Sequence, residues 1–217
     1  MRPTMVSYMS RRRSISQAVG GLLLLGLGLA LGLSALGQRS IGRAVGRTEI
    51  FPVGADSVSH VEGLTWEYLH QESTHPAVVS LARRITSGLT SDTDKANRLH
   101  WFVATQVPFV DDPEGYERMV SPGELAEAIL ANQPVYEDCD GKAALLSALA
   151  LAVGIPASVA FMDTDHDGEV DHAISVIVID GVPVYAETTV TDARLGWRPS
   201  GQVISSTLIE ERSLKPG

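Results

Sequence analysis

Cysteine is almost absent from this chain of 217 residues, which contains only Cys139. One cysteine cannot form a disulfide within the chain, and it cannot build a metal site from several thiolates. A lone thiol is therefore either a small buried side chain or a reactive group. The residues around Cys139, and the other polar residues that could reach it, decide between these two interpretations.

Acidic residues are missing from the first 47 positions, and basic residues are scarce in the rest. Residues 1–47 hold seven of the 17 Lys and Arg and no Asp or Glu, so residues 48–217 hold ten basic against 26 acidic side chains, a formal charge of −16. Nucleic acids and anionic lipid surfaces both attract basic patches. The charge balance therefore argues against either as a partner of residues 48–217, and no nucleic-acid partner is expected.

Charge of either sign is absent from Ala18 to Gly37, an apolar run that follows a basic segment, residues 1–17. A signal peptide has a shorter apolar centre and a small-residue cleavage site, for which Ala35-Leu36-Gly37 would serve. A membrane-spanning helix needs about 20 residues, which matches residues 18–37 better and favours an uncleaved signal anchor. With the N-terminal arginines in the cytoplasm, the rest of the chain lies outside it.

Residues 38–60 contain scattered Gly, Pro and Ser and are predicted to be a linker to a domain over residues 61–217. In that domain four segments have the apolar spacing and capping residues of helices, and later segments have the alternation of strands. The Asp180-Gly181 pair predicts a tight hairpin. Helices first and antiparallel strands after them indicate the α+β class. The predicted helices follow Pro76, Ser91, Ser121 and Asp140, and the predicted strands are 158–162, 172–179, 182–188 and 202–209.

Three polar residues stand at positions that suit nucleophilic catalysis. Cys139 begins a predicted helix, His172 opens a predicted strand, and Glu187 lies near the end of the next strand. A thiol, an imidazole and a carboxylate can act as nucleophile, base and orienting group. A helix N-terminus favours the thiolate, but the acidic residues beside Cys139 oppose it by repulsion. A catalytic thiol therefore requires His172 to lie close to it.

The segments around these residues resemble the transglutaminase-like superfamily. Residues 138–157, which read Asp-Cys-Asp-Gly-Lys before an apolar helix and end in Gly-Ile-Pro-Ala, resemble the nucleophile helix of its bacterial members. Asp171-His172-Ala173 resembles the histidine motif, and residues 185–189 resemble the segment that carries the acid, commonly Asp followed by Pro-Thr. The resemblance covers roughly residues 75–190. It implies a papain-like thiol core in which N-terminal helices pack on an antiparallel sheet.

The resemblance also implies cleavage or transfer at an amide through a thioester. Cys139 would be the nucleophile, His172 the general base and then acid, and Glu187 the residue that orients the imidazole. Because Glu replaces the usual Asp, the nearby Asp192 remains an alternative. The predicted protein is a single-pass, membrane-anchored cysteine peptidase or acyltransferase on the periplasmic side, acting on proteins or peptides. The alternative is a non-enzymatic accessory subunit of a larger membrane protein complex, with the same fold as a structural cap.

The segment before the histidine motif has the alternating acids of a calcium loop. Asp163, Asp165 and Asp167 are followed by Gly168, but Ile174 stands at the twelfth position, where an EF-hand requires Glu. An acidic turn between two strands is the favoured interpretation, and a calcium site is the alternative. A bound calcium would order the turn that precedes His172. No other cofactor is expected.

Overall fold

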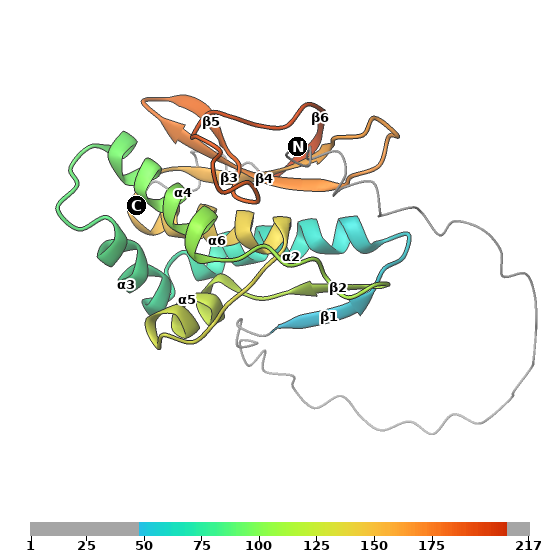
Figure 1. Cartoon of the computed structure of the whole chain (residues 1–217), viewed down its shortest axis with the longest axis horizontal. Helices are drawn as coiled ribbons and strands as arrows, with labels where there is room; N and C mark the ends of the chain where they lie inside the picture. Colours follow the sequence, from blue (N-terminus) through green and yellow to red (C-terminus); the bar gives the residue numbers. More distant parts are fainter. Residues whose placement is uncertain (1–47, 208–217) are drawn as a thin grey trace, which may run out of the picture. The chain divides into compact units, whose positions relative to one another are not determined.

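The computed structural model describes residues 48–207 (Figure 1). The basic segment, the predicted membrane-spanning segment 18–37 and the linker up to residue 47 lie outside these residues. Within residues 48–207, no helix combines the length and the apolar character needed to cross a membrane.

Residues 48–207 form an α+β domain, as the sequence predicts, with helices packed on an antiparallel sheet. The predicted helices correspond to α3 to α6, and the predicted strands to β3 to β6. Residues 49–60, assigned to the linker, instead contain β1 and the start of α2, and neither α2 nor β2 is predicted from the sequence. The elements are β1 (Glu49–Pro52), α2 (Ser57–Glu72), α3 (Pro76–Ile85), α4 (Asp92–Gln106), β2 (Tyr116–Met119), α5 (Pro122–Leu130), α6 (Cys139–Ala152), β3 (Ala157–Asp163), β4 (His172–Ile179), β5 (Val182–Ala186) and β6 (Gln202–Ser206).

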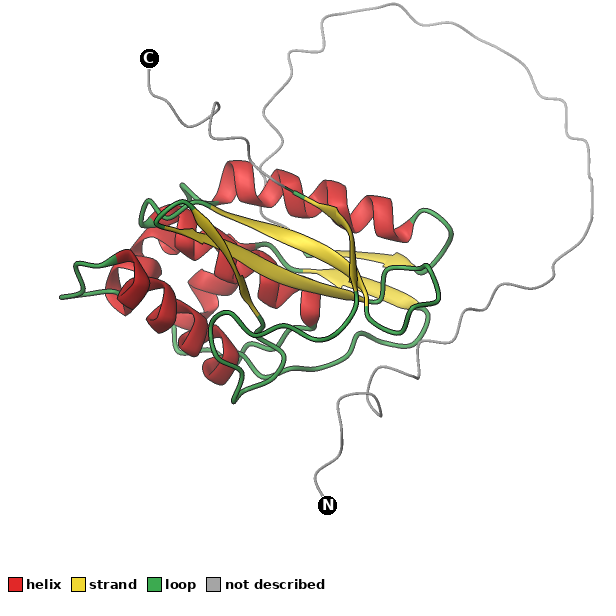
Figure 2. Cartoon of the chain, turned by 90° about the horizontal axis from the view of Figure 1, so that it is seen from above, coloured by secondary structure: helices red, strands yellow, loops and turns green. Residues whose placement is uncertain are grey.

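Helix α6 is the centre of the domain. Every residue from Asp140 to Ala150 is buried, which is the pattern of a helix surrounded by other elements. It packs against β3 and β4 on one side and against α2, α3 and α4 on the other. Figure 1 shows the four-stranded sheet lying over a layer that contains α2, α4 and α6, and Figure 2 shows the same layers from above. The nucleophile candidate thus begins the most buried helix.

The sheet has the strand order β5-β4-β3-β6, and all neighbours are antiparallel. The predicted hairpin between β4 and β5 is confirmed, because Asp180 and Gly181 have φ of 53° and 77°, as a type I′ turn requires. The Ser175 hydroxyl on β4 donates to the Ala143 carbonyl of α6 at 2.8 Å. This hydrogen bond connects the first half of β4, which begins with His172, to the first turns of α6.

Candidate active site

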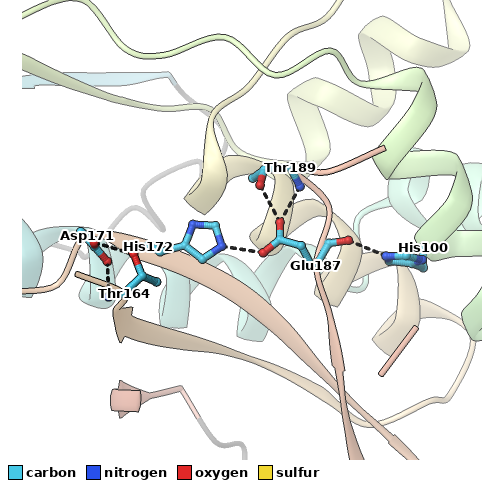
Figure 3. A network of polar contacts seen from close by, with 6 residues as sticks. All are labelled: His100, Thr164, Asp171, His172, Glu187 and Thr189. Atoms are coloured by element: carbon cyan, nitrogen blue, oxygen red, sulfur yellow. Dashed lines mark hydrogen bonds and ion pairs between the residues drawn. The ribbon is translucent and has the colours of Figure 1, made fainter. Parts of the chain in front are cut away.

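The structure brings His172 and Glu187 together. Nε2 of His172 lies 2.6 Å from Oε2 of Glu187, and the two residues are 2% and 0% exposed (Figure 3). The second carboxylate oxygen of Glu187 accepts bonds from the amide and the hydroxyl of Thr189, at 2.6 and 2.7 Å. Asp192, the alternative acid, is exposed. Glu187 is therefore the carboxylate that contacts the imidazole.

These contacts determine which ring nitrogen of His172 carries the proton. Burial alone would raise the pKa of Glu187, but the bond and charge of His172 and the two Thr189 donors together lower it. An ionised carboxylate only accepts hydrogen bonds, so Nε2 of His172 must carry the proton. Nδ1 is then the ring nitrogen that can accept one. It is buried and has no hydrogen-bond partner among residues 48–207.

Cys139 is half-buried and is the first residue of α6. The N-terminal end of a helix stabilises a thiolate, because its backbone N–H groups and its dipole favour negative charge. The turn that follows carries Lys142, whose ammonium interacts electrostatically with Glu187, and Ala143, which is bonded to β4. The first turn of α6, the start of β4 and the end of β5 therefore meet at the same end of the domain.

Buried acids surround the start of α6. The sequence indicates repulsion from the acids beside Cys139, and the structure adds Asp112 and Glu117 from distant segments. Burial, as the largest cause, raises the pKa of Asp112 to about 7 and that of Glu137 to about 8. Burial and the neighbouring Asp138 raise the pKa of Asp140 well above its usual range. The carboxyls of Asp112 and Glu137 are therefore protonated in part at neutral pH.

Arg118 on β2 supplies positive charge to this group of acids. Its guanidinium donates to Oε1 of Glu137 at 3.0 Å, and its Nε lies 4.0 Å from Oδ1 of Asp112. The carboxylates of Asp112, Glu117 and Asp138 lie within 4.8 Å of one another, and such oxygen-rich clusters suit hard cations such as calcium. No local sequence pattern indicates this cluster, because Asp138 is far along the chain from Asp112 and Glu117.

The candidate calcium loop has the structure of a turn stabilised by its own backbone. The carboxylates of Asp163, Asp165 and Asp167 also lie within 4.8 Å of one another. However, Asp163 already accepts bonds from the amides of His166 and Gly168, at 2.6 and 2.9 Å. Each carboxylate oxygen of Asp163 thus accepts one of these two backbone bonds. The bonds agree with the favoured interpretation of an acidic turn, and calcium binding here remains the alternative.

Gly141 makes room for the buried carboxyl of Glu137. A Cβ added at Gly141 would lie 2.8 Å from Cδ of Glu137 and closer still to Oε2. We therefore expect Gly141→Ala to push this carboxyl away from Arg118 and to destabilise the fold by about 1–3 kcal/mol. Gly63→Ala, in a helix with open space around it, is the matched control and should stabilise by about 0.5–1 kcal/mol. Urea unfolding measures both, and equal stabilisation by both variants would contradict the expected clash.

The solved structures with a related trace include three different proteins. Calcium-bound LapG of Legionella pneumophila is 16% identical, with a TM-score of 0.43 over 69% of this chain and 82% of LapG. A proposed cysteine protease of Cytophaga hutchinsonii is 14% identical, with a TM-score of 0.43 over 73% of this chain and 61% of that protein. A proposed protease of Parabacteroides distasonis is 15% identical, with a TM-score of 0.43 over 58% of this chain and 26% of its own.

This chain thus spans about three fifths of the Cytophaga protein and about a quarter of the Parabacteroides protein. No curated protein matches the sequence. The model of the transglutaminase-like superfamily matches residues 79–199, more than half of the chain. The match includes Cys139, His172 and Glu187, so all three candidate residues lie inside the shared domain. This protein belongs to the transglutaminase-like superfamily.

Proposed function

We propose that this protein is a cysteine peptidase or amide acyltransferase in which Cys139, His172 and Glu187 form the catalytic triad. The observation that carries the proposal is the buried contact between His172 and Glu187, which leaves Nδ1 of the imidazole to accept a proton. Cys139 begins the helix to which the same strand is bonded. These are the features that thiol-based acyl transfer needs: a nucleophile, a base and a group that orients the base.

The first half of the reaction forms a thioester. Nδ1 of His172 takes the thiol proton of Cys139, and the thiolate attacks the carbonyl carbon of an amide. The oxyanion that forms can accept a bond from the backbone N–H of Cys139 at the helix N-terminus. The imidazolium then gives its proton to the departing amine, the C–N bond breaks, and the acyl group stays on sulfur. Glu187 stabilises the imidazolium throughout.

The second half releases the acyl group. A water molecule or a primary amine gives a proton to Nδ1 of His172 and attacks the thioester carbon. The C–S bond breaks, and the thiolate and imidazolium are restored. Water as the acceptor makes the protein a peptidase, and an amine makes it a transferase.

The test compares the wild type with Cys139→Ala. Each protein is incubated with a mixture of peptides and a biotinylated primary amine, and mass spectrometry scores new N-termini and amine adducts. The wild type should produce one of these products, and Cys139→Ala should produce neither. A wild type that forms neither product and no adduct on Cys139 would contradict the proposal. If, in addition, Cys139→Ala still performs the role of the wild type in the cell, an accessory subunit is favoured instead.

We further propose that residues 18–37 anchor the protein in the cell membrane, with the domain outside the cytoplasm. The apolar length and the flanking arginines of that segment support this. Protease protection of the domain in intact cells, compared with lysed cells, tests the orientation. If the protease still requires cell lysis to digest the domain after the outer membrane has been permeabilised, the domain lies in the cytoplasm.

A further inference from the structure

Lys142 is a fully buried lysine three residues after Cys139. It is 1% exposed, and its ammonium donates to the carbonyls of Val103, at 3.1 Å, and Val107. Both carbonyls lie at the C-terminal end of α4, where the helix dipole favours a cation, and the Val103 carbonyl also accepts a bond from the amide of Val107. A buried ammonium is costly without such partners. Lys142 therefore attaches the first turn of the nucleophile helix to the end of α4.

His100 attaches another part of the site to the same helix. It lies on α4 one turn before Val103, it is 4% exposed, and its Nε2 is 2.5 Å from the backbone carbonyl of Glu187 (Figure 3). A carbonyl can only accept, so Nε2 donates. Burial, as the largest cause, lowers the pKa of His100, which agrees with a neutral ring that carries its proton on Nε2.

We propose that α4 sets the spacing between Cys139 and Glu187, with Lys142 and His100 as positioning residues. The inference rests on the proposed triad. Lys142 fixes the helix that begins with the nucleophile, and His100 fixes the backbone of the acid. The two attachments are about one turn apart on one rigid helix, so a movement of α6 against the end of β5 must break one of them. A displacement of about 1 Å can slow such chemistry about 10²-fold.

The charges around Lys142 support a role beyond packing. Burial, as the largest cause, lowers its pKa to about 8, whereas the carboxylates of Glu187 and Glu137 raise it. The ammonium also interacts with the ring of His100 and disfavours protonation of that ring. At neutral pH the cation thus helps to keep Glu187 ionised and His100 neutral. A methionine would fill the same space without that charge and without the bonds to α4.

The test measures alkylation of Cys139 by iodoacetamide between pH 5 and 10 in Lys142→Met, His100→Phe and His100→Gln. Loss of positioning should bring the apparent thiol pKa toward that of a free thiol, about 8.5, and should slow labelling at pH 6.5 about tenfold or more. His100→Gln keeps an N–H donor and should restore most of the wild-type rate. Lys95→Met, at a partly exposed position in the first turn of α4 with an ion pair to Asp92, is the matched control and should leave the pH profile of alkylation unchanged.

The alkylation profiles separate a failure of this inference from a failure of the proposed triad. Thermal unfolding of each variant shows whether it is folded. If Lys142→Met does not fold, the comparison of His100→Phe with His100→Gln tests the proposal. A depressed wild-type thiol pKa that His172→Ala abolishes, but that folded Lys142→Met and His100→Phe retain, would overturn this inference alone. A wild-type profile of a free thiol, unchanged by His172→Ala, would overturn the proposed triad and this inference with it.

Discussion

Glu187→Gln should slow formation of the acyl-enzyme about 10³–10⁴-fold while the domain stays folded. The amide oxygen of the new Gln can still accept both bonds from Thr189, which bind Oε1 of Glu187. Its NH₂ group then faces Nε2 of His172 and donates to it. This holds the tautomer that carries its proton on Nδ1, which cannot accept the thiol proton. Single-turnover kinetics with an active peptide measures the effect.

Asp192→Asn is the matched control for this experiment. It removes the nearest other downstream carboxylate, which is exposed, and should leave the rate within about twofold, as is usual for surface substitutions. A large loss in Asp192→Asn, with near-normal rates in Glu187→Gln, would assign the third role to Asp192. Circular dichroism on both variants confirms that the comparison is made between folded proteins.

Arg118→Met should cause the largest loss of stability, about 3–5 kcal/mol at pH 8.5. The substitution leaves the buried carboxyl of Glu137 without its 3.0 Å partner and removes the nearby charge from Asp112. Urea unfolding in the presence of a chelator measures the loss, because a bound divalent cation would neutralise the same acids. Arg84→Met, at an exposed position of α3, is the control and should change little.

The loss of stability in Arg118→Met should be larger at high pH than at low pH. The folded-state pKa values of about 7 for Asp112 and about 8 for Glu137 lie above their ordinary values of 3.8 and 4.5. The folded state therefore binds more protons, and the stability from these groups, complete near pH 4, is lost as the pH rises through 7 to 8. Arg118→Met should thus be far less harmful at pH 5. Equal losses at pH 5 and pH 8.5 would contradict the assignment of buried charge.

Local sequence signals were sufficient for α3 to α6 and for β3 to β6, and they nominated the three residues of the proposed triad. Ser91 and Ser121 cap α4 and α5 with their side chains, and the Asp180-Gly181 pair forms the expected turn. These features depend on a few adjacent residues, so the sequence records them directly. The contact between His172 and Glu187 follows from the hairpin, because residues at the start of one strand face residues near the end of the next.

Features that depend on distant residues were not predictable. β1 and β2 are four residues each, too short for a periodic pattern, and they were missed. Arg118 and Asp112 carry no local sign that they lie beside Glu137. Lys142 is part of the motif around Cys139, but its partners are backbone carbonyls of α4, which no side-chain pattern reveals. Such contacts arise only when the chain brings separate segments together.

The proposed triad depends on coupling between the thiol of Cys139 and the imidazole of His172. The most direct measurement is the rate of Cys139 alkylation between pH 5 and 10 in the wild type and in His172→Ala. We expect the wild type to react as a thiol with an apparent pKa well below about 8.5, and the variant to return to about that value. The same free-thiol profile in both proteins would contradict the coupling and, with it, the enzymatic function.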